Sequence, residues 1–163
     1  MNKDERQKGF TLLELMVTIS VAAIILSFGV PGFMSFIANN RAVTDTNDLV
    51  TALNLARSEA TRRGSAVTVC SSTNGTICNG DGDWSTGWIV LSSGDELLRS
   101  WPERSELGVI TATVDEFRFQ ARGSVAGVAP QFDIELPNCS GDQERVVTVN
   151  GAGRVAVARV NCS

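Results

Sequence analysis

The feature that most constrains this chain is an uncharged run of 26 residues from Leu15 to Asn40, rich in Leu, Ile, Val, Ala and Phe. A run of this length and composition is long enough to span a bilayer as a helix. A secretory signal peptide would have a shorter apolar core ending at a small-residue cleavage site, whereas this run continues into PGFMSFIANN. We therefore expect one N-terminal membrane-spanning helix.

Basic residues flank this run unequally. Lys3, Arg6 and Lys8 precede it, and Arg41 is the first basic residue beyond it. The positive-inside tendency therefore places the N-terminus in the cytoplasm and everything after about Asn40 in the periplasm. The four cysteines would then lie in an oxidising compartment.

Glu14 adjoins the apolar run, where a carboxylate costs a few kcal/mol unless it has a partner or a role. One interpretation is a side chain that reaches back to the membrane interface. The other depends on proteolysis: a cut after Gly9 would give Phe10 a positive amine one helical turn from Glu14. The second interpretation suggests a charge pair that is available for assembly.

The residues GFTLLE at positions 9 to 14, followed by the apolar run with Pro31, resemble the class III signal of type IV pilins and pseudopilins. The resemblance implies that a prepilin peptidase cuts between Gly9 and Phe10 and that Phe10 becomes N-methylated. It also implies that Glu14 pairs with the terminal amine of a neighbouring subunit. An ordinary signal anchor is the alternative.

A single helix over residues 10 to about 62 would be roughly 80 Å long, and Gly64 would end it. Gly29, Pro31 and Gly32 would weaken this helix, and we expect a kink at Pro31. Beyond Arg41 the spacing of apolar residues predicts an amphipathic helix covering a sheet. That apolar face is expected to comprise Val43, Val50, Leu53, Ala56 and Ala60.

The remaining chain consists of short β-rich runs separated mostly by Gly, Pro, Asp or Asn. The expected strands cover residues 66–70, 87–91, 97–101, 109–113, 117–119, 132–136, 146–149 and 155–160. The predicted class is α+β, with a long helix packed on antiparallel sheets. The expected organisation is a leader peptide at 1–9, a transmembrane or fibre-core helix at 10–40, and a globular periplasmic domain at 41–163.

Three internal stretches resemble the GspH/FimT (FimU-like) group of minor pilins and pseudopilins. They are ALNLARSEATRRGSAVTVC at 52–70, DWSTGWIVL at 83–91 and RVVTVNGAGRVAV at 145–157. Without any family, Trp84, Trp88 and Ile89 read as core or sheet-face residues, and Gly151 and Gly153 as turn residues. The resemblance implies a pilin fold.

The four cysteines allow three pairings. We favour Cys70 with Cys78 and Cys139 with Cys162, because pairing of sequence neighbours gives one small loop and one C-terminal staple. A zinc site would need more closely spaced ligands and reducing conditions. No metal and no cofactor are predicted.

Catalytic patterns are sparse. The sequence contains no histidine, which excludes Ser-His-Asp and Cys-His catalysis, and it has no G-x-S-x-G motif or P-loop. Asn79, Asp81 and Asp83 alternate like calcium ligands, but Trp84 and Val90 replace the expected glycine and glutamate. We expect a turn there and no enzyme, and calcium stays an open alternative.

DNA binding is a second alternative, because some FimT-type pilins bind DNA through a C-terminal G-R-x-R motif. Here Gly153 and Arg154 are followed by Val155 and Ala156, so the second arginine is missing. Loss of residues 1–9, which hold three basic and two acidic side chains, leaves 11 basic against 16 acidic residues. A phosphate-tracking surface normally has the opposite balance, which leaves Arg154 as the candidate contact and Arg62 with Arg63 as a local basic patch.

The resemblance implies a minor type IV pilin that helps initiate pilus assembly and is incorporated near the tip with other minor pilins. Its partners would be those pilins, the major pilin, the prepilin peptidase, the inner-membrane assembly platform and the inner membrane. It would be anchored in the inner membrane before entering the pilus. A GspH-type pseudopilin of a type II secretion system and a DNA-uptake pilin are the alternatives.

Overall fold

The structure is a computed structural model that describes residues 10–80, 82–103, 108–136, 139 and 141–162. Its compact units are residues up to Phe36 and residues Ile37–Ser163. One helix, α1 (Leu12–Arg63), contributes to both units. Each unit is described by itself.

Helix α1 ends as the sequence predicts. Gly64 has a φ of +63°, a left-handed conformation that glycine adopts without steric cost. The amide of Ser65 donates to the carbonyl of Ala60 at 3.3 Å, which satisfies one of the last free carbonyls of the helix. The helix continues through residues 29–32, so the Gly-Val-Pro-Gly segment does not end it. The kink at Pro31 stays a prediction.

In the first unit, the residues that the structure describes are exposed. These include all the described large apolar side chains of α1 from Leu12 to Phe36. By length and composition, α1 is the one helix in the described part of the chain that could cross a membrane. This apolar surface has no covering within its own unit, so lipid or other protein must cover it.

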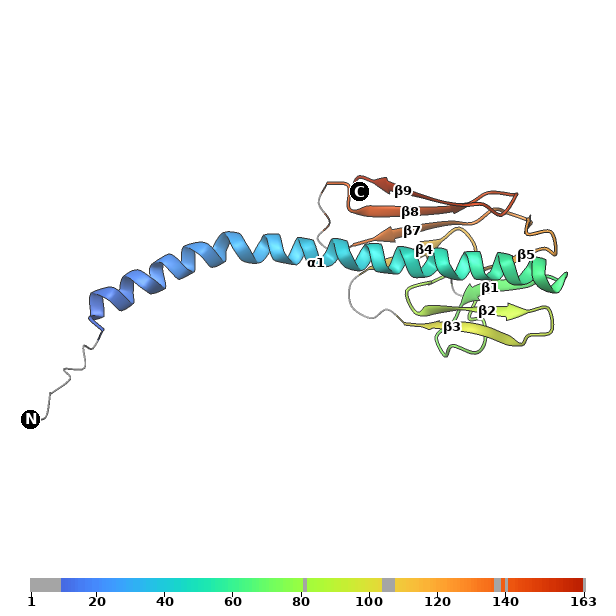
Figure 1. The fold of residues 1–163 in the computed structure, drawn as a ribbon, viewed down its shortest axis with the longest axis horizontal. Helices are drawn as coiled ribbons and strands as arrows, with labels where there is room; N and C mark the ends of the chain where they lie inside the picture. Colours follow the sequence, from blue (N-terminus) through green and yellow to red (C-terminus); the bar gives the residue numbers. More distant parts are fainter. Residues whose placement is uncertain (1–9, 81, 104–107, 137–138, 140, 163) are drawn as a thin grey trace, which may run out of the picture. The chain divides into compact units, whose positions relative to one another are not determined.

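The second unit holds the rest of α1 and two antiparallel sheets (Figure 1). The first sheet has the order β3-β2-β1-β5-β6, and the second has the order β4-β7-β8-β9. The strands of the first sheet are β1 (Val67–Ser71), β2 (Gly87–Ser92), β3 (Leu97–Pro102), β5 (Glu116–Phe119) and β6 (Val125–Ala126). Those of the second are β4 (Val109–Ala112), β7 (Gln131–Glu135), β8 (Glu144–Val149) and β9 (Val155–Val160).

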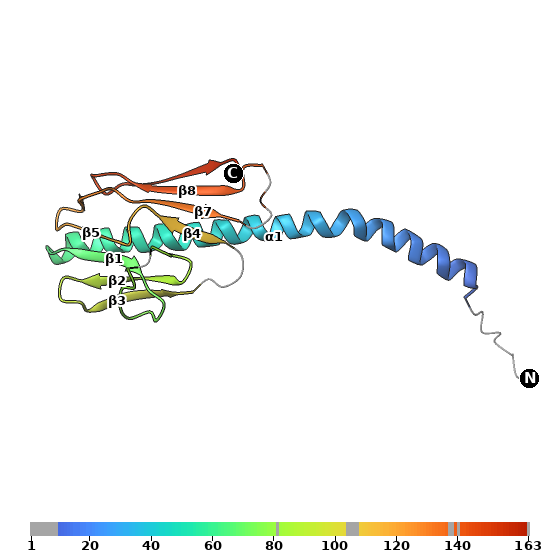
Figure 2. The same cartoon turned by 180° about the vertical axis from the view of Figure 1, so that it is seen from behind.

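These elements confirm the predicted α+β fold, a long helix on antiparallel sheets. In the view from the front and in the view from behind, the two sheets lie on different sides of α1 (Figure 1 and Figure 2). All eight predicted strands are present with small shifts at their ends. The additional strand, β6, is two residues long. So short a strand leaves no pattern in the sequence that could reveal it.

The buried face of α1 differs partly from the predicted one. Leu53, Ala56 and Ala60 are fully buried as expected, but Val43 is 36% exposed. The buried stripe instead starts at Ala42, with Thr46 and Leu49 beside it. This stripe also advances by three and four residues, so α1 is rotated slightly from the predicted face.

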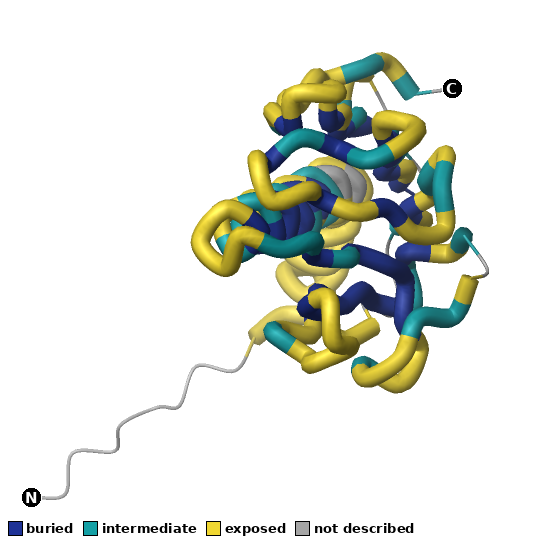
Figure 3. The backbone as a smooth tube through the Cα atoms, turned by 90° about the vertical axis from the view of Figure 1, so that its right-hand side faces the viewer, coloured by how far each residue is buried: buried dark blue, intermediate teal, exposed yellow. Residues whose placement is uncertain are grey.

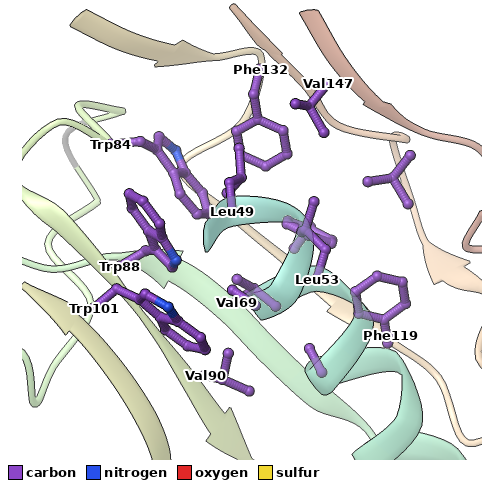
Figure 4. Packing of buried hydrophobic residues seen from close by; sticks show 14 of the residues in the cluster. Leu49, Leu53, Val69, Trp84, Trp88, Val90, Trp101, Phe119, Phe132 and Val147 are labelled. Carbon is purple, nitrogen blue, oxygen red and sulfur yellow. The ribbon is translucent and has the colours of Figure 1, made fainter. Parts of the chain in front are cut away.

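A continuous core joins the helix to both sheets. Leu49 and Leu53 of α1 point among Trp84, Trp88 and Trp101 on one side and Phe132 and Val147 on the other (Figure 4). Buried stretches of helix and strand gather at the centre of this unit, with exposed loops around them (Figure 3). The prediction that Trp84, Trp88 and Ile89 are core residues is confirmed, because all three are fully buried.

Both disulfides form as predicted. Cys70 pairs with Cys78, with 5.5 Å between their Cα atoms, and Cys139 pairs with Cys162, with 5.7 Å between theirs. The second disulfide ties the residues that follow β9 to the segment between β7 and β8. It therefore fastens the outermost strand of the second sheet.

Candidate assembly site

The N-terminal end of α1 is capped by its own sequence. The Thr11 hydroxyl accepts a hydrogen bond from the Glu14 amide at 3.2 Å, and the Thr11 carbonyl accepts one from the Leu15 amide at 3.2 Å. Thr11 is thus the N-cap, and Glu14 occupies the third helical position, the spacing of a capping box. The T-x-x-E spacing is the signal that could have revealed the role of Thr11.

Phe10 and Glu14 lie at this exposed end. Phe10 is 84% exposed, and within the described ranges no hydrogen bond or ion pair reaches the Glu14 carboxylate. A carboxylate near the positive end of the helix dipole is favourably placed. Gly9 lies outside the described residues, so its cleavage and the pairing of Glu14 with an amine stay predictions.

A second polar site lies between α1 and β9. The cleft has a volume of about 240 Å³ and is lined by Val43, Thr46, Asn47, Arg145, Val157 and Arg159. Arg145 belongs to β8 and is only 4% exposed. Burial lowers the pKa of its guanidinium, the nearby charge of Arg159 lowers it further, and Asp142 acts in the opposite direction. Sequence analysis missed Arg145, because only the strand register brings it beside Arg159.

Arg145 also connects the second sheet to the helix. Its Nη1 donates to the backbone carbonyls of residues 142, 143 and 144 at 2.7 to 3.0 Å. Its Nη2 donates to Oδ1 of Asn39 at 2.9 Å. All four acceptors are neutral, so these bonds satisfy the donors of Arg145 without neutralising its charge.

The predicted basic patch at Arg62 and Arg63 is largely neutralised. Both guanidiniums donate to Glu59, and Nη1 of Arg63 donates to Glu96 at 3.0 Å. The hydrogen bonds from Arg62 and Arg63 lower the pKa of Glu59 to about 2. This network secures the C-terminal end of α1 and leaves less free positive charge for a phosphate backbone.

Arg154 lies just before β9, and its amide donates to Oδ1 of Asn150 at 2.9 Å. Arg159 lies on the face of β9 that carries Val155 and Val157. Arg154 and Arg159 therefore do not form one basic stripe along β9. The possible DNA contact of Arg154 stays a hypothesis.

The calcium hypothesis involves a residue outside the described part of the chain, Asp81. Oδ1 of Asn79 accepts from both the amide and the hydroxyl of Thr73, at 3.1 and 3.0 Å. Oδ1 of Asp83 accepts from the Ser85 amide at 2.9 Å. These bonds fit the predicted turn and show that both side chains organise the loop.

One group of metal-ligand type occurs in the described ranges: Cys139, Glu144 and Cys162. The two cysteines form a disulfide, and disulfide sulfurs lack the thiolate charge that binds metals. This grouping therefore supports no metal site.

The exposed apolar half of α1, its capped acidic end and the α+β unit define a pilin-type subunit, a class of proteins that assemble side by side through such a helix. The family model described as "Type II transport protein GspH" matches residues 45–153, about two thirds of the chain. The model described as "Prokaryotic N-terminal methylation motif" matches residues 5–30. The chain belongs to the GspH family and is a minor pilin or pseudopilin.

Known minor pilins and pseudopilins resemble this chain, and one solved minor pilin shares its fold. The type IV minor pilin FimU of Pseudomonas aeruginosa is 24% identical, with a TM-score of 0.61 over 78% of this chain and 99% of that one. The minor pseudopilin EpsH of Vibrio cholerae is 13% identical, with a TM-score of 0.49 over 72% of this chain and 96% of that one. The type IV major fimbrial protein FimA of Dichelobacter nodosus is 29% identical over 75 residues, and the match spans 46% of each chain.

Proposed function

We propose that this protein is a minor type IV pilin that helps initiate pilus assembly and is incorporated near the pilus tip with other minor pilins. The observation that carries the proposal is the apolar half of α1, whose described large apolar side chains from Leu12 to Phe36 are exposed, with Glu14 one turn beyond Phe10 at its N-terminal end. Such a surface is stable in a bilayer or packed among similar helices, and both environments belong to the life of a pilin. The solved type IV minor pilin FimU has the same fold, which fits a pilus subunit.

The proposed role assigns a function to each residue at the N-terminal end. A prepilin peptidase cuts between Gly9 and Phe10 and methylates Phe10, and Glu14 then pairs with the terminal amine of a neighbouring subunit. The inner-membrane platform adds the subunit to the fibre, and Pro31 marks the segment that loosens on packing. The membrane-anchored form keeps its globular domain, residues 41–163, in the periplasm. The protein acts as a structural subunit and not as an enzyme.

Complementation of a deletion strain tests this proposal. The wild-type gene should restore surface pili and twitching, and Glu14→Leu should abolish both, because leucine keeps the segment in the membrane and removes the charge. Thr18→Leu, a polar-to-leucine change one turn further along, is the matched control and should restore pili. Normal piliation by Glu14→Leu would refute the role in assembly.

Processing is tested separately by immunoblotting. Gly9→Ala should leave a precursor that migrates more slowly than the wild-type protein, and Ser20→Ala should be processed normally. Equal mobility of Gly9→Ala and wild type would rule out cleavage at this bond.

A type II secretion pseudopilin is the second candidate, favoured by the description of the matching family model. The same deletion strain separates the two. Loss of type II secretion with normal pili would establish the secretion role, whereas loss of pili with normal secretion supports the pilus.

A further inference from the structure

The cleft between α1 and β9 places two arginines together without a carboxylate. Its α1 side consists of Val43, Thr46 and Asn47, and Arg145 of β8 lies beside Val157 and Arg159 of β9. None of the lining residues is acidic. Val157 is 48% exposed although its register partner, Val147, is fully buried. The helix-facing side of β9 is therefore open toward this cleft.

The two arginines are direct neighbours across the β8–β9 ladder, where Arg145 is the register partner of Arg159. Like charges that lie directly opposite one another in a sheet destabilise it. The side-chain hydrogen bonds of Arg145 go to neutral oxygens. Asp142 acts on Arg145 electrostatically, but its contact with the guanidinium is through its backbone carbonyl. An anion between the two guanidiniums would relieve this repulsion.

Arg159 is available for such an anion. It is exposed, and the part of the chain that the structure describes contains no hydrogen bond or ion pair to its guanidinium. The Arg159 guanidinium can bind phosphate oxygens through paired donors, and the charge of Arg145 beside it adds to the positive potential of the cleft. Val43 and Val157 add apolar surface beside the charges.

The position of the cleft along the sequence identifies the source of the phosphate. The uncharged run ends at Asn40, and Asn47 lies about 10 Å further along the axis of α1 at 1.5 Å per residue. The headgroup layer of each leaflet is roughly 5 to 8 Å thick. When the apolar run occupies the hydrocarbon, the part of the cleft at Val43, about 5 Å beyond Asn40, is therefore at the level of the headgroups, and Asn47 lies just beyond them.

We propose that the Arg145–Arg159 cleft binds the phosphate of an anionic phospholipid in the leaflet from which the globular unit emerges. The proposal rests on membrane anchoring by α1, which is part of the proposed function. Basic pockets next to membrane helices are a known means of binding lipid headgroups. The chain is acidic overall, so general charge attraction to an anionic surface does not account for such binding.

The test uses the full chain in detergent micelles, titrated with phosphatidylglycerol and followed by native mass spectrometry. Phosphatidylglycerol should bind and phosphatidylcholine should not. Arg159→Gln should weaken phosphatidylglycerol binding about tenfold, the effect of losing a charged hydrogen-bond donor. Arg154→Gln removes the same charge from the adjacent hairpin and should leave binding unchanged.

Four results would overturn the proposal. The first is that phosphatidylglycerol and phosphatidylcholine are retained equally, and the second is that Arg159→Gln and Arg154→Gln change lipid binding equally. The third is that free glycerol 3-phosphate binds as tightly as the lipid. The fourth is that Arg159→Gln binds lipid normally but fails to assemble into pili. The last would assign the cleft to a carboxylate of a neighbouring subunit. Carbonate extraction of cell membranes tests membrane anchoring separately from lipid binding. If the protein stays in the extracted membrane but shows no lipid selectivity, the lipid site is refuted and the proposed function is not.

Discussion

Gly153 is the position where one added methyl group should disturb the globular unit most clearly. It lies in the hairpin between β8 and β9, with a φ of +74°, and its amide donates to the Asn150 carbonyl at 2.7 Å. A Cβ at this position would lie 1.9 Å from the backbone oxygen of Gly123. Because a backbone carbonyl has no rotamer to change, the hairpin or the turn at Gly123 must move.

Gly153→Ala should therefore lower the free energy of unfolding by about 2 to 4 kcal/mol. The left-handed backbone contributes about 1 to 2 kcal/mol of this, and displacement of the hairpin contributes the rest. The hairpin also holds the bond from Nη2 of Arg57 to the Ala152 carbonyl, at 3.3 Å, so the displacement weakens a contact with α1. At about 2 to 4 °C per kcal/mol, the melting temperature should fall by about 5 to 15 °C.

Thermal unfolding of the full chain in detergent, followed by tryptophan fluorescence, measures this effect because all three tryptophans are buried. Gly151→Ala is the matched control: it lies in the same hairpin, its φ is not positive, and a Cβ there would meet nothing within 4 Å. If the two variants melt within about 2 °C of one another, the reasoning from the Gly123 contact is wrong.

Three further predictions concern the same unit. Because the folded pKa of Glu59, about 2, lies below its ordinary value of 4.5, its ion pairs stabilise the protein above pH 4.5 and are lost as the pH falls toward 2. In Glu59→Gln, the free energy of unfolding measured in urea should therefore fall less between pH 4.5 and 2 than in the wild type. An equal fall in both proteins would contradict a stabilising role for the Glu59 ion pairs. Trp84→Phe should be more destabilising than Trp88→Phe by about 1 to 2 kcal/mol in urea unfolding. The reason is that Nε1 of Trp84 donates to the Val114 carbonyl at 3.1 Å, whereas Nε1 of Trp88 has no partner among the residues that the structure describes. Equal losses would show that ring volume alone matters. Under oxidising conditions, Cys139→Ser should lower the free energy of unfolding by about 2 to 4 kcal/mol relative to the wild type. Under reducing conditions, the variant and the wild type should be equally stable.

The fold was predictable because its signals are local. The uncharged run, the glycine at the end of α1 and the turn residues between short β-rich runs each depend on a few neighbouring residues. The disulfide pairing followed from proximity in sequence. The same locality explains why the signal at Gly9, Phe10 and Glu14 is recognisable from the order of the residues alone.

What the sequence did not reveal depends on register and on packing. Val43 and Leu49 both fit a helical apolar stripe, and only the position of the sheets decides which of them is buried. Arg145 and Arg159 are 14 positions apart in the sequence, and the β8–β9 register makes them partners. A strand shifted by one residue would turn one of them to the opposite face.

The bond between Asn39 and Arg145 has a consequence for the mechanics of α1. If α1 unwinds from Gly29, Pro31 and Gly32, its intrahelical hydrogen bonds would be lost one after another along the helix. At Asn39 the unwinding would meet a side chain held from the second sheet at 2.9 Å. This bond would oppose further unwinding, so the stretch of helix that lengthens under load would end before Asn39.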